Sequence, residues 1–182
     1  HRLTVTDYYR LGEAGSFGED ERVELIEGEI IDMAPIGVGH ASRVAYLTHK
    51  LITAAGDRAV LSPQNPARLD IYSEPQPDLM LLKPRDDYYA AGHPEPDDVL
   101  LLVEVSESSL EYDRDTKLPL YAKHGVAEVW LVDLVHRRLT AFRQPGREGY
   151  GEVFEPAALG AVTISQLPGI TVDLGDLFPP GL

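Results

Sequence analysis

The sequence has 182 residues, of which 43% are hydrophobic and 25% are charged, and it contains no cysteine. This composition is typical of a globular protein with a real core, and it excludes disulfides, thiolate nucleophiles and Cys-type zinc sites. The net charge of −14 argues against non-specific binding to nucleic acid or anionic membrane, because both depend on surplus Lys and Arg. The densest apolar run, residues 99–103, is far shorter than the roughly 20 residues of a membrane-spanning helix. No signal-peptide core is seen at the start, so we expect a cytoplasmic protein without membrane contact.

The first third of the chain predicts a helix, a hairpin and a second helix. Residues 4–11 read as a short helix with Thr4 or Thr6 as its N-cap. Residues 22–33 read as two strands that turn at Glu27-Gly28. Apolar residues recur at helical spacing in residues 39–55, which predicts a longer helix with His40 in its first turn.

The remainder alternates apolar runs with polar connections, which predicts a mixed α/β sheet with helices on its faces and not a regular βαβ repeat. Residues 107–124 predict a helix that either starts near Thr116 or bends there, because Pro119 is tolerated only in a first helical turn. Residues 83–98 predict a polar loop. The expected strands cover residues 59–61, 67–71, 77–82, 99–106, 126–134, 139–143, 153–154 and 170–174.

Two acids at strand ends are the main chemical signal. Asp78 begins one apolar strand and Glu104 lies near the end of the next, and the connecting loop suggests an antiparallel pair. If Leu82 faces Leu100, then Asp78 faces Glu104 with Cβ atoms about 5 Å apart. Two carboxylates at that distance repel unless one is protonated or a cation bridges them, and oxygen ligands of this kind suit Mg²⁺ or Mn²⁺. The alternative is that both acids are solvated strand ends.

A lysine follows in the predicted helix after the second acid. Asp113, Lys117 and Tyr121 are spaced by four, so they share one helix face if the helix runs through them. A helix packed on the sheet could direct Lys117 toward the two carboxylates. The alternative is an Asp113–Lys117 ion pair on the surface, with Tyr121 as a packing residue.

The ordered set of motifs resembles the PD-(D/E)XK nuclease superfamily, and within it a bacterial branch labelled "putative restriction endonuclease". The matching pieces cover most of the chain. They are Arg22-Val23-Glu24-Leu25-Ile26-Glu27-Gly28-Glu29, His40, Pro77-Asp78-Leu79, Val103-Glu104-Val105-Ser106, Asp113, Lys117, Tyr121, Gly125-Val126, Glu128, Trp130 and Asp133.

The resemblance implies a restriction-endonuclease-like fold, in which a mixed central sheet is flanked by helices and joined by an N-terminal hairpin and extra C-terminal strands. We expect a single domain over residues 1–182, with an N-terminal layer at 1–35 and a core at 36–182. It also implies that Asp78, Glu104 and the carbonyl of Val105 hold the catalytic metal, with Glu24 as a further acid near it.

The superfamily's lysine normally lies two residues after the second acid, where this sequence has Ser106. In this branch the resemblance assigns that role to Lys117, and it makes His40 and Ser106 candidates for substrate contact. Other basic residues that could reach a phosphate are scattered: Arg43, Lys50, Lys83 and Arg85.

The implied function is a Mg²⁺- or Mn²⁺-dependent endonuclease that hydrolyses phosphodiester bonds in nucleic acid, with DNA as the expected substrate and a homodimer as the expected assembly. The displaced lysine and the charge of −14 favour an alternative, a catalytically inactive nuclease-fold module that binds nucleic acid or serves in assembly. A third hypothesis is a structural homo-oligomer whose acids are surface residues.

Overall fold

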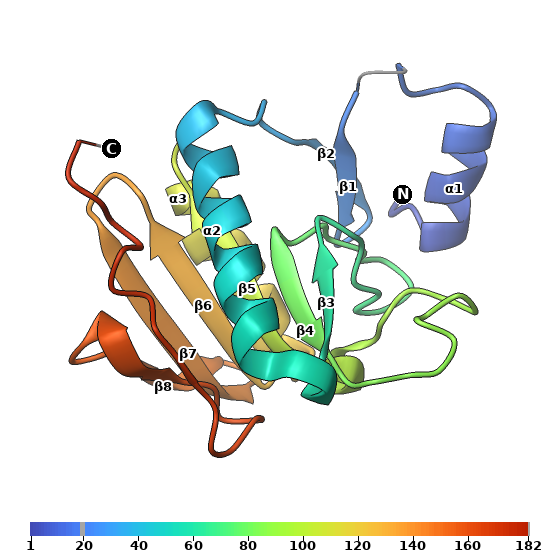
Figure 1. Ribbon diagram of the computed structural model, residues 1–182. Coiled ribbons are helices and arrows are strands. Elements are labelled where there is room, and N and C mark those ends of the chain that lie inside the picture. The colour runs from blue at the N-terminus through green and yellow to red at the C-terminus, as the bar shows by residue number, and fades with distance from the viewer. Residues whose placement is uncertain (19–20, 182) are drawn as a thin grey trace.

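A six-stranded mixed sheet forms the centre of the protein (Figure 1), whose computed structural model describes residues 1–18 and 21–181. The strand order is β3-β4-β5-β6-β7-β8, and only β5 and β6 run parallel, while the other neighbours are antiparallel. The sheet therefore has the mixed α/β character that the sequence predicts. Its strands are β3 (Val60–Pro63), β4 (Leu79–Leu82), β5 (Val99–Ser106), β6 (Glu128–Asp133), β7 (Arg138–Gly146) and β8 (Gly149–Phe154).

Alternation along the strands divides the core between the two faces of the sheet. One face packs against α2 (Val38–Ala55) through Leu47 and Leu51, and it is extended by residues of the C-terminal segment. The other face packs against α4 (Leu118–Lys123) and the N-terminal hairpin. Leu102 belongs to this second face, so Glu104, two residues later on β5, points to the same side.

The N-terminal layer consists of α1 (Val5–Glu13) and the hairpin of β1 (Val23–Ile26) and β2 (Glu29–Asp32), beside the main sheet (Figure 1). The side chain of Thr4 caps α1, and the predicted turn has positive φ at both Glu27 and Gly28. Both helices of the first third and the hairpin are thus confirmed, with small shifts at their ends.

The strand predicted at residues 67–71 is wrong. This segment belongs to a hydrogen-bonded loop, in which the N–H groups of Ala67 and Leu69 donate to the carbonyls of Pro75 and Ser73. Ala67 and Leu69 are buried in a loop instead of a sheet, while Ile71 is exposed. The C-terminal residues contribute a second small hairpin, β9 (Val162–Thr163) with β10 (Thr171–Val172), where a strand over 170–174 is predicted.

The helix predicted over residues 107–124 is interrupted. It consists of α3 (Leu110–Tyr112), a π-helical turn (Asp113–Lys117) and α4, with Pro119 in the first turn of α4. The N–H of Leu118 donates to the carbonyl of Asp113, five residues earlier. Because Pro119 has no N–H and crowds the preceding turn, the wider π turn accommodates it without ending the segment.

Short 3-10 turns complete the secondary structure at Gly56–Arg58, Pro96–Asp98 and Leu159–Ala161. Over the described part of the chain, helices long and apolar enough to cross a membrane are absent.

Candidate active site

A cavity of about 270 Å³ opens where the carboxyl end of β5 meets the N-terminal hairpin, the start of α2 and the π turn. Its lining carries more acids than bases. Within the described residues the acids are Glu24, Asp32, Asp78, Glu104, Glu107 and Asp113, and the potentially cationic side chains are Arg22, His40 and Lys117. The excess of negative charge means that a phosphate could approach the acids closely only with additional positive charge in the cavity.

Asp78 is placed by the register between β4 and β5. Leu79 pairs with Val103, so the next position along brings Asp78 opposite Glu104, as the sequence predicts. The expected pairing of Leu82 with Leu100 is wrong, since an irregularity between Leu81 and Leu82 makes Val99 the partner of Leu82. This irregularity lies at the far end of the pair and leaves the acidic end in register.

Both oxygens of the Asp78 carboxylate have partners. The backbone N–H of Val105 donates to Oδ2 at 2.8 Å, and Nε2 of His40 lies 3.0 Å from Oδ1. The hydrogen bond to Asp78 raises the pKa of His40, against the opposing effect of burial. His40 therefore reaches across from the first turn of α2 to orient Asp78, and its side chain also lines the cavity.

Glu104 is almost completely buried, and two donors converge on one of its oxygens. Lys117 Nζ lies 2.8 Å from Oε1, and the hydroxyl of Tyr121 donates to the same atom at 2.6 Å. Burial raises the pKa of Glu104 to about 8, with further contributions from the carboxylates of Asp113 and Asp78 and an opposing one from Lys117. The carboxyl group is thus held in one orientation, with Oε2 left for another partner.

Lys117 joins Glu104 to Glu24, which is 80 residues earlier than Glu104. Its Nζ lies 3.3 Å from Oε2 of Glu24, an atom that also accepts the backbone N–H of Gln76 at 2.9 Å. Burial alone would lower the pKa of Lys117, but the carboxylates of Glu104, Glu24 and Asp113 outweigh it and raise this pKa. Lys117 is therefore a protonated, buried residue, and the alternative of a surface pair with Asp113 is wrong.

Asp113 and Ser106 form a supporting layer beside these groups. The hydroxyls of Ser106 and Ser109 donate to Oδ2 of Asp113 at 2.7 and 2.6 Å, and burial raises the pKa of Asp113. Ser106 is fully buried and lies outside the described lining of the cavity. Ser106 lies on the same face of β5 as Glu104, two residues earlier, and its hydroxyl orients Asp113, which itself lines the cavity. The expected contact of Ser106 with substrate stays a prediction.

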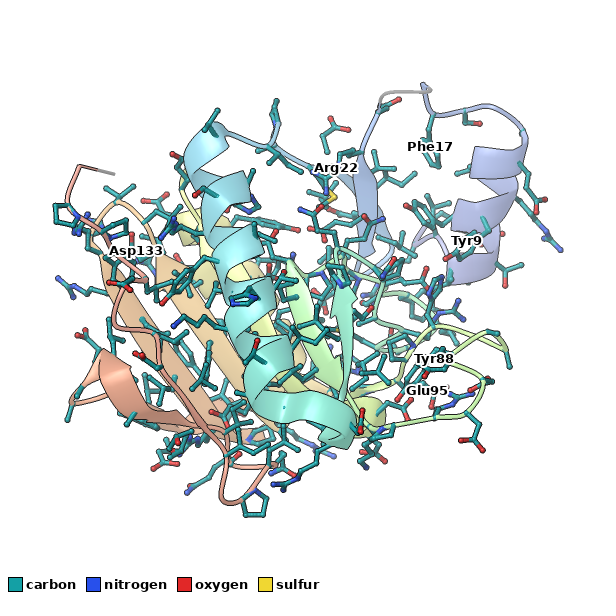
Figure 2. All side chains as sticks on the ribbon, in the orientation of Figure 1. Tyr9, Phe17, Arg22, Tyr88, Glu95 and Asp133 are labelled. Carbon is teal, nitrogen blue, oxygen red and sulfur yellow. The ribbon has the colours of Figure 1, made fainter. Side chains whose placement is uncertain are left out.

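The sequence did not reveal two further features of the cavity. Tyr121, expected to be a packing residue, donates to the same oxygen of Glu104 that Lys117 contacts, because the two residues are four apart on the same side of the segment. Arg22, at the start of the hairpin, lines the cavity (labelled in Figure 2). The scattered basic candidates have other contacts: Arg43 donates to carbonyls of the C-terminal segment, Lys50 lies near Asp173, and Arg85 pairs with Asp87.

The carboxylate oxygens of Asp78 and Glu104 and the carbonyl oxygen of Val105 are donors that suit a hard divalent cation. Among the described residues no cluster of three or more His, Asp or Glu side chains is arranged to hold a metal, so a site here would combine two carboxylates with backbone oxygen. The N–H of Val105 points to Asp78, and Ser106 directs its carbonyl to Leu134 on the opposite side of β5. The Val105 carbonyl is therefore on the Asp78 side. Mg²⁺ is commonly bound through one or two carboxylates with the remaining positions filled by water.

The mixed sheet, with two strand-end carboxylates and a buried lysine at one edge, is the arrangement of a nuclease-like α/β fold. The same fold is found in a crystal structure described as a putative nuclease belonging to DUF820 from Anabaena variabilis ATCC 29413. That protein is 20% identical, the match covers 97% of each chain, and the TM-score is 0.69. Comparison with curated proteins gives no match.

The family model for Uma2, described as "Putative restriction endonuclease", matches residues 5–175, and the chain therefore belongs to this family. The match includes each of the cavity residues discussed above. The assignment to the restriction-endonuclease-like superfamily is thereby confirmed.

Proposed function

We propose that this protein is a divalent-metal-dependent endonuclease that hydrolyses phosphodiester bonds in DNA. The observation that carries the proposal is the position of Lys117. Its Nζ lies 2.8 Å from Glu104 although 13 positions separate the two residues in the sequence, so a lysine stands at the acidic pair despite Ser106 at the usual position. This placement weakens the main argument for an inactive nuclease-fold module.

Each residue has a role that follows from its contacts. Asp78, Glu104 and the carbonyl of Val105 would hold Mg²⁺ or Mn²⁺, which when bound lowers the pKa of a coordinated water and polarises a phosphoryl oxygen. His40 and the N–H of Val105 fix the Asp78 carboxylate, while Tyr121 fixes Glu104. Such fixed positions matter because reacting groups must be held in a narrow range of geometry.

Lys117 would orient the attacking water and offset the negative charge that develops on the phosphate during attack. Glu24 holds the ammonium group from the opposite side and keeps it protonated. Water would add to phosphorus and lose a proton, the ester P–O bond would break, and the leaving oxygen would take up a proton, so that one product end carries a phosphate and the other a hydroxyl. His40, at the edge of the cavity, is the candidate for contact with a neighbouring phosphate.

The wider parts of the proposal rest on the nuclease class alone. A single domain over residues 1–182, a homodimer that pairs two sites to cut two strands, and a cytoplasmic location are expected on this basis.

The test is a plasmid-nicking assay with purified protein in Mg²⁺, Mn²⁺ or EDTA. We expect nicking that requires the metal and is lost in Asp78→Ala and Glu104→Gln. Bound but intact DNA would instead favour the inactive module, and a protein that neither binds nor cuts would favour a structural role. Asp173→Ala is the matched control, because Asp173 is an exposed acid outside the cavity.

A further inference from the structure

A second cavity lies directly beside the candidate active site. It has a volume of about 170 Å³, and Glu107 lines both cavities. Glu107 follows β5, and Leu134 and Val135 follow β6, which is parallel to β5, so the second cavity is at the carboxyl ends of the two parallel strands. In open α/β sheets this edge is where ligands usually bind. We call this second cavity the side cavity.

The start of α2 separates the two cavities. Gly37 and His40 line the candidate active site, whereas Gly39 and Arg43 line the side cavity. Figure 2 shows the same division, with Arg22 and Asp133 on opposite sides of the N-terminal half of α2. A chain molecule whose phosphate lies beside Asp78 and Glu104 could therefore extend past α2 into the side cavity.

The walls of the side cavity are mostly apolar: Leu134, Val135, Leu177, Phe178 and Pro179. Val135 is 62% exposed and lies beside these walls. Exposed apolar side chains also lie at the opening of the candidate active site, where Ile36 and Val38 are 43% and 88% exposed. Exposed apolar groups gathered around a hollow indicate a surface that binds another molecule.

Two arginines line the side cavity, Arg43 and Arg137, and the contacts they already make favour a flat ring over a phosphate. Arg43 donates through Nη1 to the carbonyls of Asp176 and Leu177 and through Nη2 to Ser42, so these donors are already used within the protein. An anion would have to compete for them. Arg137 donates to the carbonyls of Phe178 and Pro179, and the guanidinium groups of Arg43 and Arg137 lie over the rings of Tyr46 and Phe178. A nucleobase needs only apolar contact, which the walls of the side cavity provide.

On these grounds we infer that the side cavity is a subsite for an unpaired nucleobase next to the phosphodiester that is cut. The inference rests on the proposed nuclease function and adds the substrate class, which is nucleic acid with an unpaired nucleotide at the cleavage site. A base that is paired and stacked in a duplex has both faces covered, so it must leave the helix to enter a cavity.

The experiment uses an end-labelled single-stranded oligonucleotide in Mn²⁺, with its cut positions mapped, followed by a series in which one nucleotide at a time is made abasic. We expect one abasic position, at a fixed distance from the cut, to slow cleavage about tenfold, since stacking on a protein contributes on this order per base. The same sequence as an intact duplex should be cut at least tenfold more slowly than the single strand.

Variants then assign the effect to the side cavity. In Phe178→Ala the intact oligonucleotide should be cut about tenfold more slowly, and the abasic substitution should have no further effect. Val135→Asp, at an exposed position where folding is not at risk, should give a similar loss. Val153→Asp is its matched control, because Val153 is 55% exposed on β8 and lies outside the described linings of both cavities. This substitution adds the same negative charge away from the side cavity.

Several results would overturn the inference. One is equal cleavage of all abasic oligonucleotides, and another is an abasic effect that is unchanged in Phe178→Ala. A third is a wild-type dimer that Val135→Asp converts to a monomer, because a second copy would then cover the side cavity. If the wild type cuts nothing, the proposed function fails separately. Fluorescence anisotropy then decides the inference: the wild type should bind the single strand about tenfold more tightly than Phe178→Ala, and equal affinities would refute the subsite.

Discussion

The buried carboxyl group of Glu104 predicts an unusual pH dependence of stability. Its folded-state pKa is about 8 against an ordinary value of 4.5, so between these pH values the folded protein retains a proton that the unfolded chain has released. The free energy of unfolding must then fall as pH rises through this window, and the contribution of Glu104 is fully present only below about pH 4.5.

The perturbation is Glu104→Gln, which removes the titration while the amide oxygen can still accept from Lys117 and Tyr121. At 1.36 kcal/mol per pKa unit, the 2.5 units between 4.5 and pH 7 give a destabilisation of about 3 kcal/mol in the wild type. The metal-free variant should therefore be about 3 kcal/mol more stable at pH 7, or roughly 6–12 °C in melting temperature for a chain of this size.

The assay is chemical or thermal unfolding of both proteins in EDTA from pH 4.5 to pH 8.5. We expect similar stabilities near pH 4.5 and a difference that grows with pH and levels off above pH 8. His40 also has a raised pKa, so its stabilising charge is lost with rising pH in both proteins and cancels in the comparison. Parallel stability curves for the two proteins would refute the assignment of a buried carboxyl group with a raised pKa at this position.

Two further predictions concern the same cavity. Asp78→Asn should leave the metal-free melting temperature unchanged or higher, because it relieves repulsion with Glu104 and Asp113. It should also reduce the stabilisation by metal, which at 100 times the dissociation constant adds about 2.7 kcal/mol to the free energy of unfolding of the wild type. Equal stabilisation of both proteins by Mg²⁺ and Mn²⁺ would contradict a site at Asp78. Lys117→Ala should slow nicking more than tenfold without weakening metal binding, because Nζ contacts Glu24 and Glu104 and adds positive charge beside the acids. Turnover at the wild-type rate across a Mg²⁺ titration would return Lys117 to a structural role.

The sequence by itself determined the elements whose signals are local. The continuous apolar runs of β4 and β5, the turn at Glu27-Gly28 and the helical spacing of α2 are local signals, and all three elements are present in the structure. The sequence also predicts that Asp78 lies opposite Glu104, because this follows from the antiparallel register at the acidic end of β4 and β5. The failed strand at residues 67–71 shows the limit of this signal, since an apolar segment can be buried in a loop as well as in a sheet.

The tertiary structure alone decided how distant groups combine. The contact of Lys117 with both Glu24 and Glu104 depends on the π turn before Pro119 and on the hairpin that packs beside it, and neither has a periodic signature. Ser106 lies on the same face of β5 as Glu104 and yet is fully buried, because its hydroxyl donates to Asp113 of the π turn, which packs over it. The side cavity is assembled from α2, the ends of β5 and β6 and the C-terminal segment, so only the packed fold brings its walls together. The physical reason is that local patterns fix which face of an element is apolar, while long-range packing decides what that face meets.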